Sequence, residues 1–275
     1  MDNRQRVVVV TGASSGIGNA CATFLAKKGY KVYGTCRNPG VYARKADEFF
    51  EMLALDLTDD GSVTKAGASI LAKAGKVDAL VCCAGMGIAG PLEECSMAEI
   101  HLQLDSNLYG TIRTIKAFLP AMREAGSGKI LVFGSVAGLV GMPFQGLYSA
   151  GKFALEGLVE SLRHEIRPFG IGACIVEPGD FRTGFTAARR FAAATTQASP
   201  YWRNFQAVMG VQTSDEAHGA HPLAAARTVA RLIEARRLPI RRVTGPFFYR
   251  LVAFCKRVMP GRLFEGFYRL YYKLH

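Results

Sequence analysis

The sequence predicts an α/β fold: a single doubly wound domain in which helices cover both faces of a parallel sheet. Short runs of β-branched and other apolar residues alternate along the chain with amphipathic stretches of helix length, a pattern typical of a parallel sheet. The chain has 275 residues, of which 49% are hydrophobic and 20% charged, so it can bury one large core. Because it shows no internal repeat and no linker, residues 1–275 are expected to form one domain.

The order of the predicted elements supports this fold. Strands are predicted over residues 6–11, 31–36, 50–55, 77–83, 129–133, 171–176 and 243–245. Helices are predicted over residues 16–28, 59–74, 148–167 and 222–237, with two more inside 96–124. Residues 180–221 lose the pattern, and we expect an irregular insertion that acts as a lid over the substrate. Residues 247–275 form a basic, aromatic C-terminal extension.

Composition excludes several classes of protein. The seven cysteines are odd in number and lack CxxC or metal-ligand spacing, which argues against a disulfide scaffold and against a metal site. The N-terminal apolar run spans only residues 7–10, and no stretch approaches the ~18 apolar residues of a membrane-spanning helix. These features predict a cytoplasmic protein.

The first predicted strand leads into Thr11-Gly12-Ala13-Ser14-Ser15-Gly16-Ile17-Gly18, which opens a helix. Glycines at this spacing allow a tight turn, close approach of the backbone to a pyrophosphate, and packing of helix on strand. The free amides at the start of the helix favour an anion. A Rossmann-type dinucleotide site is therefore predicted, with contacts from Gly12, Ser14, Ser15, Gly16, Ile17 and Gly18.

This TGASSGIG segment resembles the cofactor motif of the classical short-chain dehydrogenase/reductase family, and the resemblance continues to about residue 185 and more loosely to the C-terminus. The resemblance implies an oxidoreductase that uses a nicotinamide dinucleotide. Arg37 follows the second strand, where an acid would select NAD, so NADP(H) is expected in preference to NAD(H). Further cofactor contacts implied by the family are Asp56 and Leu57 at the adenine, and Ala84 and Gly85.

Cysteines occupy two positions where the family has asparagines, just before Ala84. Cys83 lacks the amide that ties strands together in the family, so the local structure is expected to be weaker. Cys82 and Cys83 are interpreted as buried and inert, because free cysteine is usually a core residue.

Tyr148 and Lys152 lie four residues apart on a predicted helix, so both side chains point to one face. A neighbouring ammonium stabilises a phenolate, and we expect it to lower the pKa of Tyr148 toward that of a useful acid/base. Ser135 ends the fifth strand, where ligands of open α/β sheets bind. The resemblance implies that Ser135 orients the substrate oxygen and that Asn107 holds a water linking Lys152 to solvent. It also implies cofactor contacts from Asn107, Tyr148, Lys152, Pro178, Gly179, Phe181 and Thr183.

The segment from Ser135 to Leu158 resembles the 17β-hydroxysteroid and retinol dehydrogenase branch, which implies a small lipophilic ketone or alcohol as substrate. The predicted pocket wall is apolar: Met86, Ile88, Leu139, Val140, Met142, Phe144, Phe181 and Phe185. Two alternatives are a 3-oxoacyl-thioester reductase of the same fold and a non-catalytic NADP(H)-sensing regulatory protein. The family also implies a homo-oligomer, a dimer or tetramer.

The net charge is +12, and residues 231–275 contain eleven Lys and Arg against two acids. Nucleic-acid binding is not predicted, because a basic patch alone is weak evidence for it. The aromatic and basic residues of 247–275 suit either a helix that lies on a membrane or a helix that packs over the pocket or a subunit partner. Pro260 and Gly261 interrupt the segment, which argues against one long helix lying on a membrane.

Overall fold

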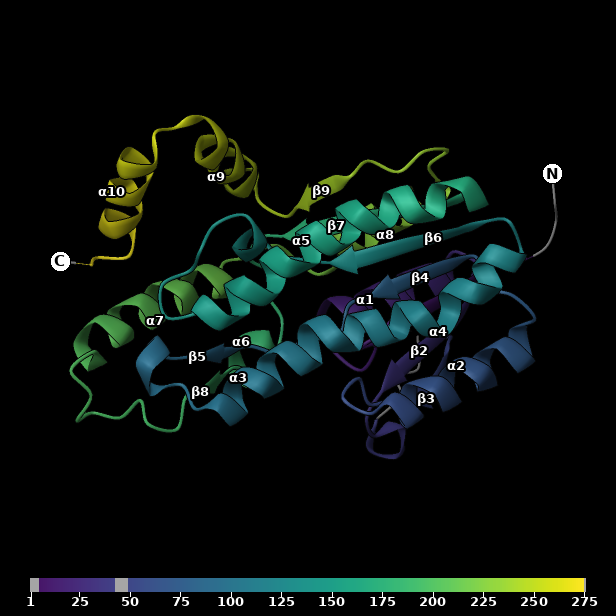
Figure 1. Cartoon of the computed structure of the whole chain (residues 1–275), viewed down its shortest axis with the longest axis horizontal. Coiled ribbons are helices and arrows are strands. Elements are labelled where there is room, and N and C mark those ends of the chain that lie inside the picture. The colour runs from purple at the N-terminus through teal and green to yellow at the C-terminus, as the bar shows by residue number, and fades with distance from the viewer. Residues whose placement is uncertain (1–4, 43–48, 275) are drawn as a thin grey trace.

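The computed structural model describes residues 5–42 and 49–274. The predicted domain limits at residues 1 and 275 lie outside these ranges, as does the last residue of the predicted C-terminal extension. The main strands are β1 Val7–Thr11, β2 Lys31–Cys36, β3 Glu51–Ala54, β4 Ala79–Cys82, β6 Gly128–Phe133, β7 Ile171–Pro178 and β9 Arg241–Thr244. They form one parallel sheet in the order β3-β2-β1-β4-β6-β7-β9 (Figure 1). The doubly wound sheet predicted from the sequence is confirmed.

Helices cover both faces of this sheet (Figure 1). On one face lie α1 Gly16–Lys27 and α8 Leu223–Glu234, and on the other lie α2 Asp60–Ala74, α4 Gly110–Glu124 and α5 Gly146–Ile166. Beyond the carboxyl ends of the strands lie α3 Met97–Leu104, α6 Phe185–Ala188, α7 Trp202–Ala217, α9 Phe247–Val258 and α10 Gly261–Tyr271, together with the short parallel pair β5 Ile88–Ala89 and β8 Arg190–Phe191.

Side-chain alternation along the strands builds two separate cores. Val8 and Val10 of β1 pack with α1 and α8, whereas Val7 and Val9 pack with α2, α4 and α5. Both faces of β1 are therefore buried, which explains why this strand is a continuous apolar run rather than an alternating one.

The sheet changes its winding direction at β1. Val9 of β1 pairs with Tyr33 of β2 on one side and with Leu80 of β4 on the other. The chain thus runs outward from β1 in both directions, and the loops after β1 and β4 separate at their carboxyl ends. Open α/β sheets bind ligands in the crevice that forms at such a point.

The prediction for residues 180–221 is partly wrong, because the segment contains the sixteen-residue helix α7. Its buried residues Phe205, Val208, Met209 and Gln212 follow helical spacing and form one side of the helix. The buried glutamine interrupts the apolar stripe in the sequence, so the helical period was missed.

Phe118 of α4 is fully buried at the centre of the core between α2, α4 and α5. We expect Phe118→Ala to lower the free energy of unfolding by about 3–5 kcal/mol, because it removes a large side chain and leaves a cavity. Urea unfolding measures this change. The matched control is Phe169→Ala at an exposed phenylalanine, where a change within about 0.5 kcal/mol is expected. Equal losses in the two variants would contradict the assigned core.

Candidate active site

The loop after β1 has the backbone geometry that a phosphate site needs. Gly12 has φ +68°, and a Cβ there would lie 2.8 Å from the Cα of Ala84, so only glycine fits. Helix α1 begins at Gly16, and its first amides have no partner within the helix. The residues at the start of this helix, Ser14, Ser15 and Gly16, line the cavity. Because free amides and the positive end of a helix dipole favour an anion, the loop suits a pyrophosphate.

One continuous cavity of about 540 Å³ runs from this loop across the carboxyl ends of the strands. Nearly all the residues predicted to bind the cofactor line it: Gly12, Ser14, Ser15, Gly16, Ile17, Gly18, Arg37, Asp56, Leu57, Ala84, Gly85, Tyr148, Lys152, Pro178, Gly179, Phe181 and Thr183. Asn107 is the exception and lies behind the wall, next to the lining residue Ser106. The cradle therefore fits a dinucleotide, with its phosphates over α1.

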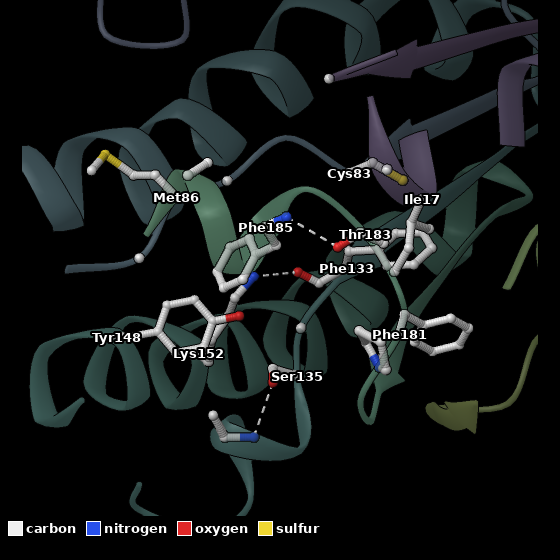
Figure 2. A pocket seen from close by; sticks show the side chains of 18 of the residues that line it. Ile17, Cys83, Met86, Phe133, Ser135, Tyr148, Lys152, Phe181, Thr183 and Phe185 are labelled. Carbon is white, nitrogen blue, oxygen red and sulfur yellow. Dashed lines mark hydrogen bonds between the residues drawn. The ribbon is translucent and has the colours of Figure 1, made fainter. Parts of the chain in front are cut away.

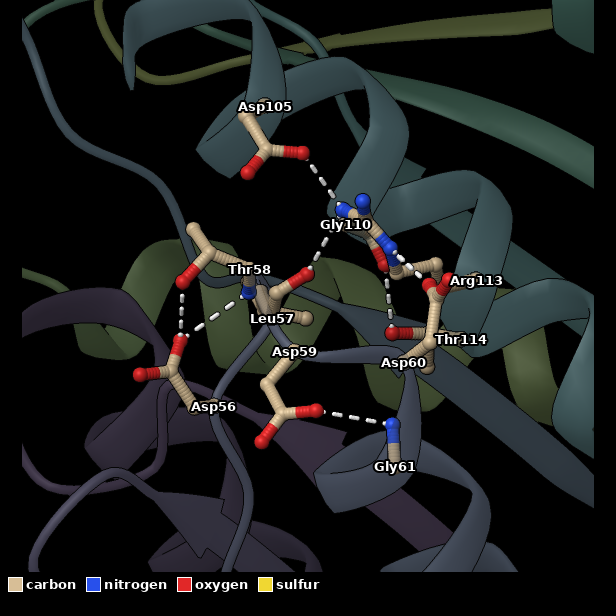
Figure 3. Close-up of polar contacts among 10 residues, drawn as sticks. All are labelled: Asp56, Leu57, Thr58, Asp59, Asp60, Gly61, Asp105, Gly110, Arg113 and Thr114. Carbon is tan, nitrogen blue, oxygen red and sulfur yellow. Dashed lines mark hydrogen bonds and ion pairs between the residues drawn. The ribbon is translucent and has the colours of Figure 1, made fainter.

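Arg37 lines the cavity, and its charge acts on Asp56 in the loop after β3. Contacts within the protein hold this loop in place (Figure 3). The Asp56 carboxylate accepts hydrogen bonds from the backbone N–H of Thr58 at 2.9 Å and from its hydroxyl at 2.8 Å. The Thr58 amide and, more weakly, the Arg37 charge hold the pKa of Asp56 below its usual value. Arg113 donates to the Leu57 carbonyl at 3.0 Å. The loop predicted to meet the adenine is thus fixed by the protein's own contacts.

The loop after β4 obtains its hydrogen bonds without the family's asparagine. The Thr11 hydroxyl accepts from the backbone N–H of Cys83 at 3.1 Å and of Ala84 at 3.2 Å. The Asn107 amide binds both backbone groups of Met86, accepting at 2.9 Å and donating at 2.8 Å. The local weakness expected from Cys83 is therefore offset by these contacts.

Asn107 lies in a π-helical turn, Asp105–Tyr109, between α3 and α4. Such turns are rare and are often found at functional sites. Gln103, one turn earlier, also binds this loop, donating to the Met86 carbonyl at 3.0 Å and accepting from the Ile88 amide at 2.7 Å. The structure thus places Asn107 as a support for the cavity wall, and its predicted contact with a water stays a prediction.

The two adjacent cysteines differ in their exposure. Cys82 is buried, whereas Cys83 is partly buried and lines the cavity, so the expected burial is confirmed for Cys82 alone. Burial raises the pKa of Cys82 to about 12 and also raises that of Cys83, which favours the neutral thiol over the nucleophilic thiolate.

The side chains of Ser135, Tyr148 and Lys152 meet at one point on the cavity wall (Figure 2). The Lys152 ammonium lies 5.5 Å from the centre of the Tyr148 ring and donates to the Phe133 carbonyl at 2.8 Å. The Ser135 hydroxyl accepts from the backbone N–H of Ala137 at 3.1 Å, which fixes its position. A strand end and the first turns of α5 thus bring these three groups together.

Burial is the main cause of the pKa shifts of Tyr148 and Lys152. It raises the pKa of Tyr148 to about 12, against the weaker lowering effect of a hydrogen bond with Ser135. Burial also lowers the pKa of Lys152 to about 8. The direction for Tyr148 is opposite to the expected lowering of its pKa. Desolvation of the phenolate is the largest effect, the charges of Glu177 and Glu216 add to it, and only the hydrogen bond with Ser135 and the charge of Arg189 oppose it. A protonated phenol is the form that donates a proton.

Glu177 was not singled out from the sequence. It is the last residue but one of β7 and is fully buried, and burial together with the neighbouring Glu156 raises its pKa well above the usual value. Arg241 binds Glu156 through its Nε at 2.9 Å, and the charge of Glu177 acts on Lys152. A Cβ at Gly134 would collide with the Glu177 carboxyl. A charged residue near the end of an apolar strand was the available signal.

The substrate end of the cavity differs from the predicted wall. Met86, Met142, Phe181 and Phe185 line it as expected. The other four predicted lining residues pack elsewhere: Ile88 in β5, Leu139 and Val140 against α9 and α10, and Phe144 against Phe205. Side chains of the C-terminal helices take their place: Phe248, Tyr249, Val252, Phe267, Tyr268 and Tyr271, followed by Tyr272.

Three carboxylates also line this end: Asp180, Asp215 and Glu216. Tyrosine hydroxyls from the C-terminal helices hold two of them, since Tyr249 donates to Asp180 and Tyr271 donates to Asp215 at 2.7 Å. Burial raises the pKa of Asp180 to about 6. Arg189 pairs with the third carboxylate, so the cluster keeps two acids without a paired cation among the residues that the structure describes.

We expect Tyr148→Phe to lower the rate of carbonyl reduction by about 100- to 10,000-fold, because it removes the proton donor and keeps the ring. Oxidation of NADPH, followed by absorbance, measures the rate. Cofactor binding, followed by NADPH fluorescence, is the control and should stay within about two-fold, as the ring contact with Phe185 at 5.9 Å is retained. A variant with undiminished turnover would contradict the assignment of Tyr148.

Known proteins with this arrangement identify the family. Residues 6–193 match the family model described as short chain dehydrogenase. The chain is 37% identical to a 3-ketodihydrosphingosine reductase of Bacteroides thetaiotaomicron, over 98% of each chain. It is 43% identical to human 17-beta-hydroxysteroid dehydrogenase type 1, over 65% of this chain and 58% of that protein.

A solved structure agrees with these sequence matches. The short chain dehydrogenase/reductase of Burkholderia phymatum in complex with NAD superposes with a TM-score of 0.80 at 27% identity, over 95% of this chain and 97% of that one. The chain belongs to the short-chain dehydrogenase family, whose members are oxidoreductases acting on alcohol and carbonyl groups.

Proposed function

We propose that this protein is an NADP(H)-dependent oxidoreductase that interconverts a ketone or aldehyde and an alcohol on a lipophilic substrate. The observation that carries the proposal is the meeting of Ser135, Tyr148 and Lys152 on the wall of one cavity. One end of that cavity is the phosphate loop, and the other is lined by aromatic side chains of α9 and α10. Both reactants thus have a site beside the same three groups.

The proposed reaction uses the groups in these positions. When bound, the reduced cofactor supplies a hydride to the carbonyl carbon. The Ser135 hydroxyl orients the substrate oxygen, and the Tyr148 phenol gives this oxygen its proton as the carbonyl π bond opens. Lys152 would hold the cofactor ribose. Its ammonium passes a proton back to Tyr148 and takes up a proton from solvent, which returns the site to its starting state. Alcohol oxidation follows the same path in reverse.

Arg37 supports the preference for NADP(H). It follows β2, is exposed to the cavity, and stands where an acid would bind the 2′-hydroxyl of NAD. Its guanidinium suits a 2′-phosphate, because it forms charge-assisted hydrogen bonds with phosphate oxygens.

We expect Arg37→Ser to weaken NADPH binding by about 10- to 100-fold, the cost of losing a hydrogen bond to a charged group. NADH binding to the same variant is the internal control and should change by less than about three-fold. Fluorescence titration of both cofactors measures the two affinities. An equal loss for NADPH and NADH would show that Arg37 does not select the phosphate.

The substrate class has two candidates. A steroid- or retinoid-like ketone suits the aromatic lining, and a named relative acts on hydroxysteroids. A long-chain amino ketone is favoured by Asp180, Asp215 and Glu216, since carboxylates beside tyrosine rings bind an ammonium group and a neutral steroid offers them no partner. A relative that matches over 98% of its length is named for a substrate of this kind, 3-ketodihydrosphingosine.

The remaining alternatives receive less support. A 3-oxoacyl thioester on a carrier has no ammonium group for the three carboxylates to bind. A cofactor sensor without turnover does not need the set of Ser135, Tyr148 and Lys152. A cytoplasmic location and a homo-oligomeric state stay predictions from the sequence.

If the amino ketone is the substrate, Asp180→Asn should raise its KM by about 10-fold or more, because the carboxylate partner of the ammonium is lost. In the unaltered protein, Asp180 is neutral below its pKa of about 6 and ionised above it. The KM for the amino ketone should therefore rise as the pH falls through about 6.

Steady-state kinetics with 3-ketodihydrosphingosine and with a ketone of equal chain length that lacks the amino group make the comparison. The KM for the neutral ketone should rise neither in Asp180→Asn nor as the pH falls through about 6. The neutral ketone therefore controls for changes in the fold or in the Ser135, Tyr148 and Lys152 group. Better turnover of a 17-ketosteroid, unchanged in Asp180→Asn, would instead support the steroid candidate.

A further inference from the structure

Helices α9 and α10 each have two different faces, and one face of each lines the substrate end of the cavity. Phe248, Tyr249 and Val252 point inward from α9, and Phe267, Tyr268 and Tyr271 from α10. Tyr249 rests against Gly179 so closely that a Cβ there would collide with its ring. The two helices are therefore a roof of the pocket, one of the two arrangements expected from the sequence.

The opposite face of this roof carries large apolar side chains that nothing in the described chain covers. On α9 they are Phe247, Leu251, Phe254 and Val258, spaced as one helical stripe. On α10 they are Leu263 and Leu270, and the half-exposed Phe267 lies at the border between the two faces. Leu270 is 79% exposed and Phe254 is 61% exposed. A soluble protein rarely exposes so many neighbouring apolar side chains unless they contact a partner or a membrane.

The charge around this apolar face has one sign. Five exposed cations flank it, against the single acid Glu265: Arg250, Arg257, Arg262, Arg269 and Lys273. A sixth cation, Lys256, lies on the other side of α9, 5.1 Å from the centre of the Phe264 ring. The carboxylates that the structure describes leave these cations without an ion pair. A second copy of the same face would bring like charges together, which disfavours self-association. An anionic surface is complementary to it.

The shape of the roof fits a bilayer surface. The helices have 12 and 11 residues, so they are about 18 and 16 Å long and too short to cross the hydrocarbon core. Among the residues described, no helix is long and apolar enough to span a membrane. Figure 1 shows the two helices as a pair that follows β9 in the chain and lies at one end of the molecule, apart from the helices that cover the sheet. Such helices lie in the interface with their apolar side chains among the lipids.

We propose that the outer face of α9 and α10 docks on an anionic lipid bilayer, with its apolar stripe inserted and its cations at the headgroups. The inner face of the same helices lines the substrate end of the cavity, so docking places the pocket roof at the bilayer. A lipophilic substrate then passes from the bilayer into the pocket between these two helices rather than through water. The proposal concerns the surface alone and holds whichever lipophilic ketone is reduced.

The test is flotation of the full-length protein with vesicles of phosphatidylcholine alone and with vesicles that contain phosphatidylglycerol. We expect binding to the anionic vesicles, at least about ten-fold stronger than to neutral ones and weakened by 0.5 M salt, because the attraction includes surface charge. The double variant Phe254→Ser/Leu270→Ser should bind anionic vesicles about ten-fold more weakly, since two apolar side chains no longer insert.

The matched control is Leu92→Ser/Phe169→Ser, which changes two exposed apolar residues outside the C-terminal helices and should bind as the unaltered protein does. Binding of NADPH shows that both variants are folded, and flotation needs no turnover, so its result is independent of the proposed enzyme activity. Absence of vesicle binding, or equal binding of neutral and anionic vesicles, would overturn the proposal. So would a dimer in solution that Phe254→Ser/Leu270→Ser dissociates, because the face would then serve self-association.

Discussion

The pairing of β1 with β2 on one side and with β4 on the other is the constraint on which the rest of the structure depends. It forces the chain to wind outward in both directions and leaves a crevice at the carboxyl ends of the strands. The phosphate loop, the loop after β4 and Ser135 all occupy that edge because they follow parallel strands. Helix α5 then supplies Tyr148 and Lys152 to the same edge. Each functional group is thus held by a rigid element rather than by a free loop.

Much of this arrangement was predictable from local sequence. The glycine spacing of residues 12–18 and the four-residue separation of Tyr148 and Lys152 each encode geometry within one or two turns of chain. The positions of the arginine after β2 and the serine after β6 at the ligand-binding edge were predictable from the direction of these two strands alone. The sheet and most strand limits were predictable because both faces of the sheet are buried, so each strand is an apolar run.

What the sequence did not predict depends on distant contacts or on solvation. Packing of the C-terminal segment over the pocket was one of the two arrangements expected, but no local pattern showed that Tyr249 and Tyr268 would be among its lining side chains. Helix α7 was missed because its inner face contains a buried glutamine, Gln212. The pKa of Tyr148 was expected in the wrong direction, since its burial is a property of the folded protein. Glu177 was overlooked for the same reason.

The charges of the molecule divide between its two surfaces. The net charge is +12, yet the substrate end of the cavity carries Asp180, Asp215 and Glu216. The cations of α9 and α10 face outward, whereas the tyrosines of the same helices bind two of these acids from within. A roof with cations outside and hydrogen bonds to carboxylates inside suits a substrate with a long apolar chain and a positively charged head.

Transfer of deuterium from cofactor to substrate tests the central claim most directly. The protein would be incubated with NADPH that carries deuterium at both C4 positions of the nicotinamide and with the long-chain amino ketone or a 17-ketosteroid, and the alcohol analysed by mass spectrometry. We predict one deuterium on the carbon that was the carbonyl. An alcohol without deuterium, or no alcohol from either ketone although NADPH binds, would contradict the account.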